Sequence, residues 1–179
     1  MPGVKGGFFS IGATGSIGKG KKSKMGKAVP AAPPPPPQEI TIGGDPDDHP
    51  MDWGGGSTLI TDGPADGTGK ITKVAFYAKS TTYNPYFGIF YRTGPNLYTC
   101  RDWVQIMGTY FRKEVHDVDV DLDVVEGDYL GMYWRYNEGE VGKASAPPQW
   151  YKSGNQMGCV DAEFSPPWPG TGISLAGSG

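Results

Sequence analysis

Four aspartates at every second position are the residues of this chain whose spacing most resembles a metal site. Asp117, Asp119, Asp121 and Asp123 alternate with Val118, Val120, Leu122 and Val124. A period of two places the carboxylates on one face of a β-strand, ~6.7 Å apart. Calcium takes oxygen ligands at ~2.4 Å, so strand neighbours could share an ion only with help from loops.

The spacing around the aspartates does not match a calcium-binding EF-hand loop. Counted from Asp117, the sixth position is Leu122 rather than Gly, and the twelfth is Asp128 rather than Glu. We therefore interpret the aspartates as a solvated strand face that discourages edge-to-edge pairing. The sequence predicts no metal site and no cofactor.

Large aromatic residues near the C-terminus form a second candidate site. Trp150, Tyr151 and Trp168 stand in loop-like contexts. Exposed Trp and Tyr rings stack on sugars or anchor protein interfaces, which makes these three residues candidates for glycan or partner contact. The alternative is that they close the ends of a hydrophobic core, as large aromatic residues usually do.

Patterns typical of enzymes are absent from the sequence. His49 and His116 lie far apart, and no Cys and His residues have zinc-site spacing. Residues 15–22 nearly spell a phosphate-binding loop, but Lys22 stands where Ser or Thr must hold Mg²⁺. Two carboxylates that cleave a glycan could meet only in the fold, and this remains the weakest alternative. We expect a protein that is not an enzyme.

The two cysteines, Cys100 and Cys159, are interpreted as small core residues, with a disulfide between them as the alternative. The sequence contains no continuous apolar segment of the kind found in signal peptides, and no stretch approaches the ~20 apolar residues that span a bilayer. We therefore expect neither a secretory signal nor a membrane span.

Composition divides the chain at about residue 57. Residues 1–37 hold six Lys and no acid, whereas residues 38–179 hold ten Lys or Arg and 19 Asp or Glu, a net charge of −9. Glycine-rich stretches and the run Pro33–Pro37 predict an extended basic arm and linker over residues 1–57. Residues 38–57 are expected to lack regular structure. An acidic body makes nucleic acid an improbable partner.

The arm offers a set of anchors for assembly with neighbouring subunits. Its large apolar side chains are Phe8 and Phe9, and its clustered cations are Lys19, Lys21, Lys22, Lys24 and Lys27. Glycine lets two backbones approach closely, and a proline run sets a fixed reach.

Residues 58–179 are expected to fold as an all-β domain. Segments with alternating apolar residues are separated by Gly, Pro, Asn and Asp turns, and no window has the spacing of an amphipathic helix. We predict an antiparallel β-sandwich of the jelly-roll kind, with residues 115–134 as a β-hairpin that turns at Glu126–Asp128. Val120, Leu122 and either Tyr133 or Trp134 should point into its core.

Three segments together carry a resemblance to a family. They read Gly69-Lys-Ile-Thr-Lys-Val-Ala-Phe-Tyr-Ala78, Val124-Val-Glu-Gly-Asp-Tyr-Leu-Gly-Met-Tyr-Trp134 and Ile173-Ser-Leu-Ala-Gly177. Residues 58–177 thereby resemble the jelly-roll or β-sandwich modules of tailed-bacteriophage virion proteins, such as capsid decoration proteins and tail-fibre heads. The resemblance implies a structural or binding protein, often trimeric, and supplies no catalytic residues.

The leading hypothesis is a non-enzymatic virion structural protein that is assembled in the host cytoplasm and anchored by its arm. Its partners would be other virion proteins and further copies of itself, with a trimer favoured. The alternative hypothesis is a carbohydrate-binding module that recognises a host receptor. Position in the capsid, tail or fibre stays open.

Overall fold

The computed structural model describes residues 38–144, 150–166 and 172–179. Residues Pro37–Gly179 form one compact unit. The described residues are all-β, and two large antiparallel sheets curl toward a barrel, as predicted for the body of the chain. None of the described residues belongs to a helix long and apolar enough to cross a membrane.

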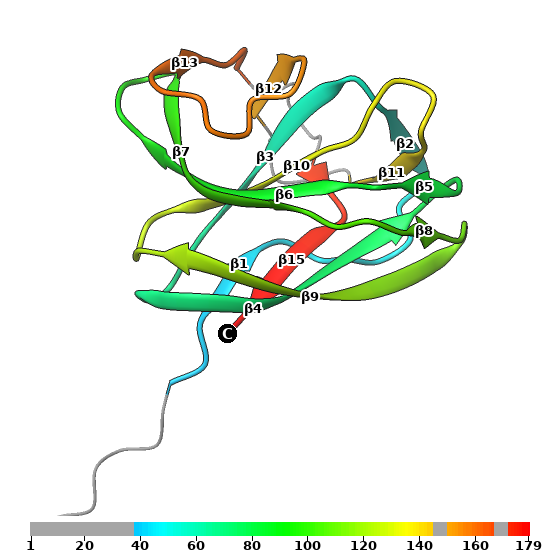
Figure 1. Ribbon diagram of the computed structural model, residues 1–179, viewed down its shortest axis with the longest axis horizontal. Coiled ribbons are helices and arrows are strands. Elements are labelled where there is room, and N and C mark those ends of the chain that lie inside the picture. The colour runs from blue at the N-terminus through cyan, green and yellow to red at the C-terminus, as the bar shows by residue number, and fades with distance from the viewer. Residues whose placement is uncertain (1–37, 145–149, 167–171) are drawn as a thin grey trace, which may run out of the picture. The chain divides into compact units, whose positions relative to one another are not determined.

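The first large sheet has seven strands (Figure 1). Its order is β1, β15, β4, β11 and β14, while β9 pairs with β4 and β2 pairs with β11. These strands are β1 (Thr41–Gly43), β2 (Met51–Gly54), β4 (Gly69–Ala78), β9 (Glu114–Val124), β11 (Glu140–Ala144), β14 (Gly172–Ile173) and β15 (Leu175–Ser178).

The second large sheet has six strands, in the order β12, β3, β10, β6, β7 and β13. They are β3 (Ser57–Pro64), β6 (Tyr86–Arg92), β7 (Leu97–Gln105), β10 (Tyr129–Tyr133), β12 (Trp150–Ser153) and β13 (Ala162–Glu163). The short strands β5 (Thr82–Tyr83) and β8 (Thr109–Tyr110) form a separate pair. Strands β6 and β7 form a hairpin, which the Thr93 N–H closes by donating to the Leu97 carbonyl oxygen over 2.9 Å.

The main hydrophobic core lies between the two sheets. Its fully buried side chains come from alternate positions of the long strands, and Trp134 contributes the largest. The buried apolar residues of this core are Ile42, Leu59, Ala65, Ile71, Val74, Phe76, Ala78, Phe87, Ile89, Val118, Leu122, Val124, Leu130, Met132, Trp134, Val141, Ile173 and Leu175.

Strand β9 confirms the period-two pattern but not the predicted hairpin. Val118, Leu122 and Val124 are buried, and the aspartates between them are exposed. However, β9 pairs with β4 in the seven-stranded sheet, whereas β10 lies between β3 and β6 in the six-stranded sheet. The turn at residues 125–128 therefore crosses between the layers. Gly127, at φ +88°, has the left-handed conformation that this tight crossing needs.

The prediction that residues 38–57 lack regular structure is wrong. Strand β1 pairs with β15, and β2 pairs with β11, so the seven-stranded sheet begins at Thr41. Backbone hydrogen bonds create these short strands, and Ile42 is the one side chain of β1 that reaches the core. These strands could not be recognised from the sequence, because they are flanked by Gly, Pro and Asp residues and are too short to show an alternation of apolar residues.

Candidate binding site at the open end of the six-stranded sheet

One segment covers half of the outer face of the six-stranded sheet. Strand β12 pairs with β3 at one edge, and β13 pairs with β7 at the other edge. Tyr151 and Ser165 join the two ends, since the Ser165 N–H donates to the Tyr151 carbonyl oxygen over 2.9 Å. We call residues 150–165 the arch; Figure 1 shows it above β6 and β7.

Under the arch lies a second core, separate from the core between the sheets. Ile60, Phe90, Tyr98 and Phe164 are its fully buried side chains. Rings meet edge-on there, with the Tyr98 and Phe164 centroids 5.5 Å apart. This burial raises the pKa of the Tyr98 phenol above its ordinary value, because the charged form would lose its water.

Beyond the arch, the same face carries a row of partly exposed aromatic rings. Tyr133, Tyr86 and Gln105 are direct cross-strand partners on β10, β6 and β7, so their side chains share one face of the sheet. Trp103, two residues before Gln105 and opposite Gly88, lies on that face too. We call these four residues the aromatic row.

Ring contacts make the aromatic row continuous. The Tyr86 ring centroid lies 5.6 Å from that of Tyr133 and 6.2 Å from that of Trp103. Trp103 is 47% exposed, and the two tyrosines and Gln105 are half-buried. Among the residues with described placement, no hydrogen-bond partner is found for the Gln105 side chain.

The turn of the arch at residues 155–158 forms the rim of the row. A methyl group added to Gly88 would lie 2.6 Å from the Met157 sulfur, so this position must be small for the arch to approach the sheet. A similar group on Gly158 would lie 3.4 Å from Trp103 Nε1. Aromatic faces beside amide groups suit a ligand with both apolar and hydroxyl-rich surfaces.

The structure separates the aromatic residues that the sequence grouped. Trp150 and Tyr151 are neighbours on β12, so their side chains point to opposite faces. Trp150 packs in the second core, and the Arg92 guanidinium carbon lies 4.8 Å from its ring centre. Tyr151 packs against the main core, with its ring centroid 5.8 Å from that of Trp53.

Eight of the candidate residues named from the sequence lie outside the described residues. They are Phe8, Phe9, Lys19, Lys21, Lys22, Lys24, Lys27 and Trp168.

The four aspartates at alternate positions of β9, called here the aspartate ladder, are exposed, and two of them pair with Lys70. Lys70 Nζ lies 2.9 Å from Asp121 Oδ1 and 2.9 Å from Asp123 Oδ1. These two hydrogen bonds raise the pKa of the Lys70 ammonium. Within the described ranges, no three His, Cys, Asp or Glu residues are placed to hold a metal ion together.

Sequence reasoning missed one buried ion pair near the crossing between the sheets. Arg101 Nε donates to Asp128 Oδ2 over 2.6 Å, and a second guanidinium nitrogen donates to Oδ1 over 3.2 Å. Asp128 Oδ2 also accepts the Val125 N–H over 2.9 Å, and the Asp128 side chain is only 4% exposed. The guanidinium also lies over the Tyr91 ring, 4.8 Å from its centre. The only local signal for Asp128 was turn composition.

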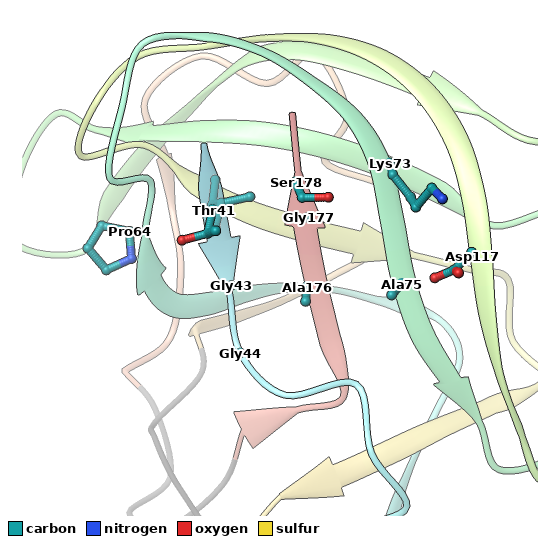
Figure 2. A pocket seen from close by; sticks show the side chains of 11 residues that line it. Thr41, Gly43, Gly44, Pro64, Lys73, Ala75, Asp117, Ala176, Gly177 and Ser178 are labelled. Atoms are coloured by element: carbon teal, nitrogen blue, oxygen red, sulfur yellow. The ribbon is translucent and has the colours of Figure 1, made fainter. Parts of the chain in front are cut away.

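A hollow with a volume of about 410 Å³ lies on the outer face of the seven-stranded sheet. Its floor is a cross-strand row of small residues, Gly43, Ala176 and Ala75, on β1, β15 and β4. Figure 2 shows Lys73 and Asp117 at one side of the hollow. The lining combines the hydroxyl groups of Thr41 and Ser178 with the charged side chains of Lys73 and Asp117.

The two cysteines lie beside each other under the arch. The Cys100 N–H donates to the Cys159 carbonyl oxygen over 2.9 Å, and both side chains pack against the second core as free thiols. Burial raises the pKa of the Cys100 thiol to about 11 and also raises the pKa of Cys159. The interpretation as small core residues therefore agrees with their placement.

Comparison of the chain with models of known protein families found no match, and a search of curated proteins found none.

Proposed function

We propose that this protein is a non-enzymatic structural component of a virus particle, of the capsid-decoration or tail-fibre kind. In this proposal residues 1–37 attach the β-sandwich to neighbouring subunits. The resemblance of residues 58–177 to phage virion modules points to the particle. The hydrogen bonds that hold β1, the first strand after residues 1–37, support the proposed attachment.

The observation that carries the proposal is a set of hydrogen bonds between Thr41 and Asp66. They fix β1, the strand that follows the basic segment. Thr41 donates to Asp66 twice, from its N–H to Oδ1 and from its hydroxyl to Oδ2, each over 2.7 Å. The Asp66 N–H donates back to the Thr41 carbonyl oxygen over 3.1 Å. These bonds hold the pKa of the Asp66 carboxyl below its ordinary value.

These hydrogen bonds matter because a force applied to residues 1–37 would act first on β1, the strand that follows them. Residues preceding Gln38 are covalently joined to the sandwich just before β1, which has three residues. Ile40 and Gly179 add a reciprocal pair of backbone hydrogen bonds of 2.7 and 3.0 Å. The beginning and the end of the described chain are therefore hydrogen-bonded to each other at the edge of the seven-stranded sheet.

The partners of the proposed protein are other virion proteins and further copies of itself, with a trimer favoured and assembly in the host cytoplasm. Phe8 and Phe9 would supply the apolar part of the attachment, and burying each would contribute ~2 kcal/mol. The lysines of residues 19–27 would pair with acidic surface in exposed contacts that salt weakens.

The test compares the full chain with two shortened proteins in particle assembly. A protein that lacks residues 1–37 should melt as the full chain does but should not be incorporated into purified particles. A protein that lacks residues 1–57 should melt at a lower temperature, because it also loses β1 and β2. Mass spectrometry and electron microscopy of the particles measure incorporation.

A matched pair of variants separates apolar from electrostatic attachment. Phe8→Ala with Phe9→Ala should reduce incorporation more than neutralising any two of the lysines. If the protein without residues 1–37 is incorporated as well as the full chain, or if the full chain is not found in particles at all, the proposal is wrong.

A further inference from the structure

The aromatic row (Tyr133, Tyr86, Gln105 and Trp103) lies on the same sheet face as the second core, but it has no fully buried member and Trp103 is 47% exposed. The arch buries the half of the face that contains Phe90 and Tyr98 and stops at Met157 and Gly158. Beyond that rim, three rings follow one another across β10, β6 and β7. We infer that the aromatic row is a binding site for the apolar face of a neutral oligosaccharide.

The chemistry of the row matches the two kinds of surface on a sugar ring. Pyranose rings present C–H groups on their faces, which stack on Trp and Tyr, and hydroxyl groups around their edges. The exposed indole of Trp103 supplies a stacking surface. Gln105, the direct cross-strand neighbour of Tyr86, supplies an amide that can both donate and accept hydrogen bonds.

The charge of the row selects a neutral ligand. None of its four side chains ionises at neutral pH, so it offers no cation to a phosphate or sulfate group. The nearest carboxylate in sequence, Asp102, is already engaged with backbone: it accepts the Trp103 N–H over 2.8 Å and the Asp123 N–H over 2.9 Å. A nucleic acid, which is bound chiefly through its phosphates, therefore finds no counterpart there.

The size of the row favours an oligosaccharide over a protein. Three strands place its outer members about 10 Å apart, the scale of a short oligosaccharide. A stable protein interface buries roughly 800 Å² on each partner, with some 20–30 residues a side. Four side chains, three of them half-buried, fall far short of that area.

The strands hold the row in a fixed geometry. Strand β10 is hydrogen-bonded to β3 and β6, and β6 is hydrogen-bonded to β10 and β7, so Tyr133 and Tyr86 stand on central strands. A rigid surface loses little conformational entropy when a ligand binds. This inference does not depend on the proposed role in a virus particle.

The test begins with the full-length protein on an array of neutral oligomers of glucose, N-acetylglucosamine, galactose and mannose, together with sialylated and sulfated glycans. Titration calorimetry then measures the affinity for the best neutral oligomer. Trp103→Ala should weaken binding about tenfold or more, the loss expected when a stacked ring is removed. Gln105→Ala should weaken binding several-fold, because a ligand hydroxyl group loses its partner.

Phe111→Ala is the matched control, because Phe111 is also an exposed aromatic residue, at 64%, but lies outside the row. It should bind as the wild type does, and thermal melts should show that all three variants are folded. The inference is overturned if the wild type binds no neutral glycan, if it binds only charged glycans, or if Trp103→Ala and Gln105→Ala both bind normally. Loss of self-association in Trp103→Ala, without any glycan binding, would identify the row as a protein interface instead.

Discussion

Replacing Asp128 should destabilise the fold more than replacing any aspartate of the β9 ladder. Its carboxylate accepts two hydrogen bonds from Arg101 and one from the Val125 N–H, and its side chain is 4% exposed. Breaking a buried ion pair from one side costs roughly 3–5 kcal/mol. Arg101 is 32% exposed, so water can partly solvate its guanidinium after the carboxylate is lost. We therefore expect about 3 kcal/mol for Asp128→Ala.

Asp128→Asn separates charge from hydrogen bonding. The amide oxygen can still accept the Val125 N–H, so the cost should fall to about 1.5–2 kcal/mol, the lower part of the range for a single hydrogen bond to a charged group. Arg101→Met keeps much of the apolar stem and removes the guanidinium. In that background Asp128→Ala should cost less than in the wild type, since no unpaired cation remains beside the vacated site.

Urea unfolding followed by circular dichroism measures these differences. With a slope of about 2 kcal/mol per M, a loss of 3 kcal/mol lowers the midpoint by about 1.5 M. The reasoning fails if Asp128→Ala lies within about 0.5 kcal/mol of the wild type. It also fails if Asp128→Ala costs the same with and without Arg101, because the cycle would then show no coupling.

Two further predictions concern the cores. Leu122→Ala should cost ~2–5 kcal/mol in the same urea assay. Val120→Ala on the same strand should cost less, because Val120 is only half-buried. If the two substitutions cost the same, the packing of β9 described here is wrong. Because the pKa of Cys100 is raised to about 11, its thiol should react slowly with iodoacetamide at pH 8 in the folded protein and quickly in urea. The raised pKa means that this group's contribution to stability is complete below the unfolded pKa of ~8.5 and is lost as pH rises through about 11. Equal reaction rates in folded and unfolded protein would contradict the burial of Cys100.

The elements that could be predicted from sequence are those in which one strand face is buried. The alternation of Val118, Leu122 and Val124 with aspartates identified β9 because that strand has a solvated face. Strand β6 is buried on both faces, since Phe87 and Ile89 face the main core while Phe90 faces the second core; the alternation of Phe87, Ile89 and Tyr91 still indicates a strand there. Burial on both faces weakens the alternation on which such a prediction depends.

The sequence could not predict which strands pair with each other. Alternation of apolar and polar residues shows which face of a strand is buried, but not which strand lies beside it. The turn between β9 and β10 has the composition of a hairpin turn, yet it carries the chain from one sheet to the other. Asp128 and Arg101 meet beside that crossing, from positions 27 residues apart. No local pattern indicates such a pair.

The aromatic row was missed for a similar reason. Tyr86, Trp103 and Tyr133 come from three strands and become neighbours only through the register of the sheet. Trp150 and Tyr151 attracted attention because they are adjacent in sequence, but adjacency on a strand places two side chains on opposite faces. Directly adjacent strand residues therefore do not share a surface, and cross-strand registers are needed to find a binding surface.

The arch and the aromatic row occupy two parts of one face of the six-stranded sheet, and the two parts differ in how far their aromatic rings are buried. Under the arch the Tyr98 hydroxyl is buried, with no hydrogen-bond partner among the described residues, at a cost of roughly 1–3 kcal/mol. Burial of Phe90, Phe164 and the Tyr98 ring, at roughly 1.5–3 kcal/mol each, more than offsets that cost. In the aromatic row the Trp103 ring, which is larger than these, stays 47% exposed. A sugar ring stacked on it would cover apolar surface that the arch leaves accessible.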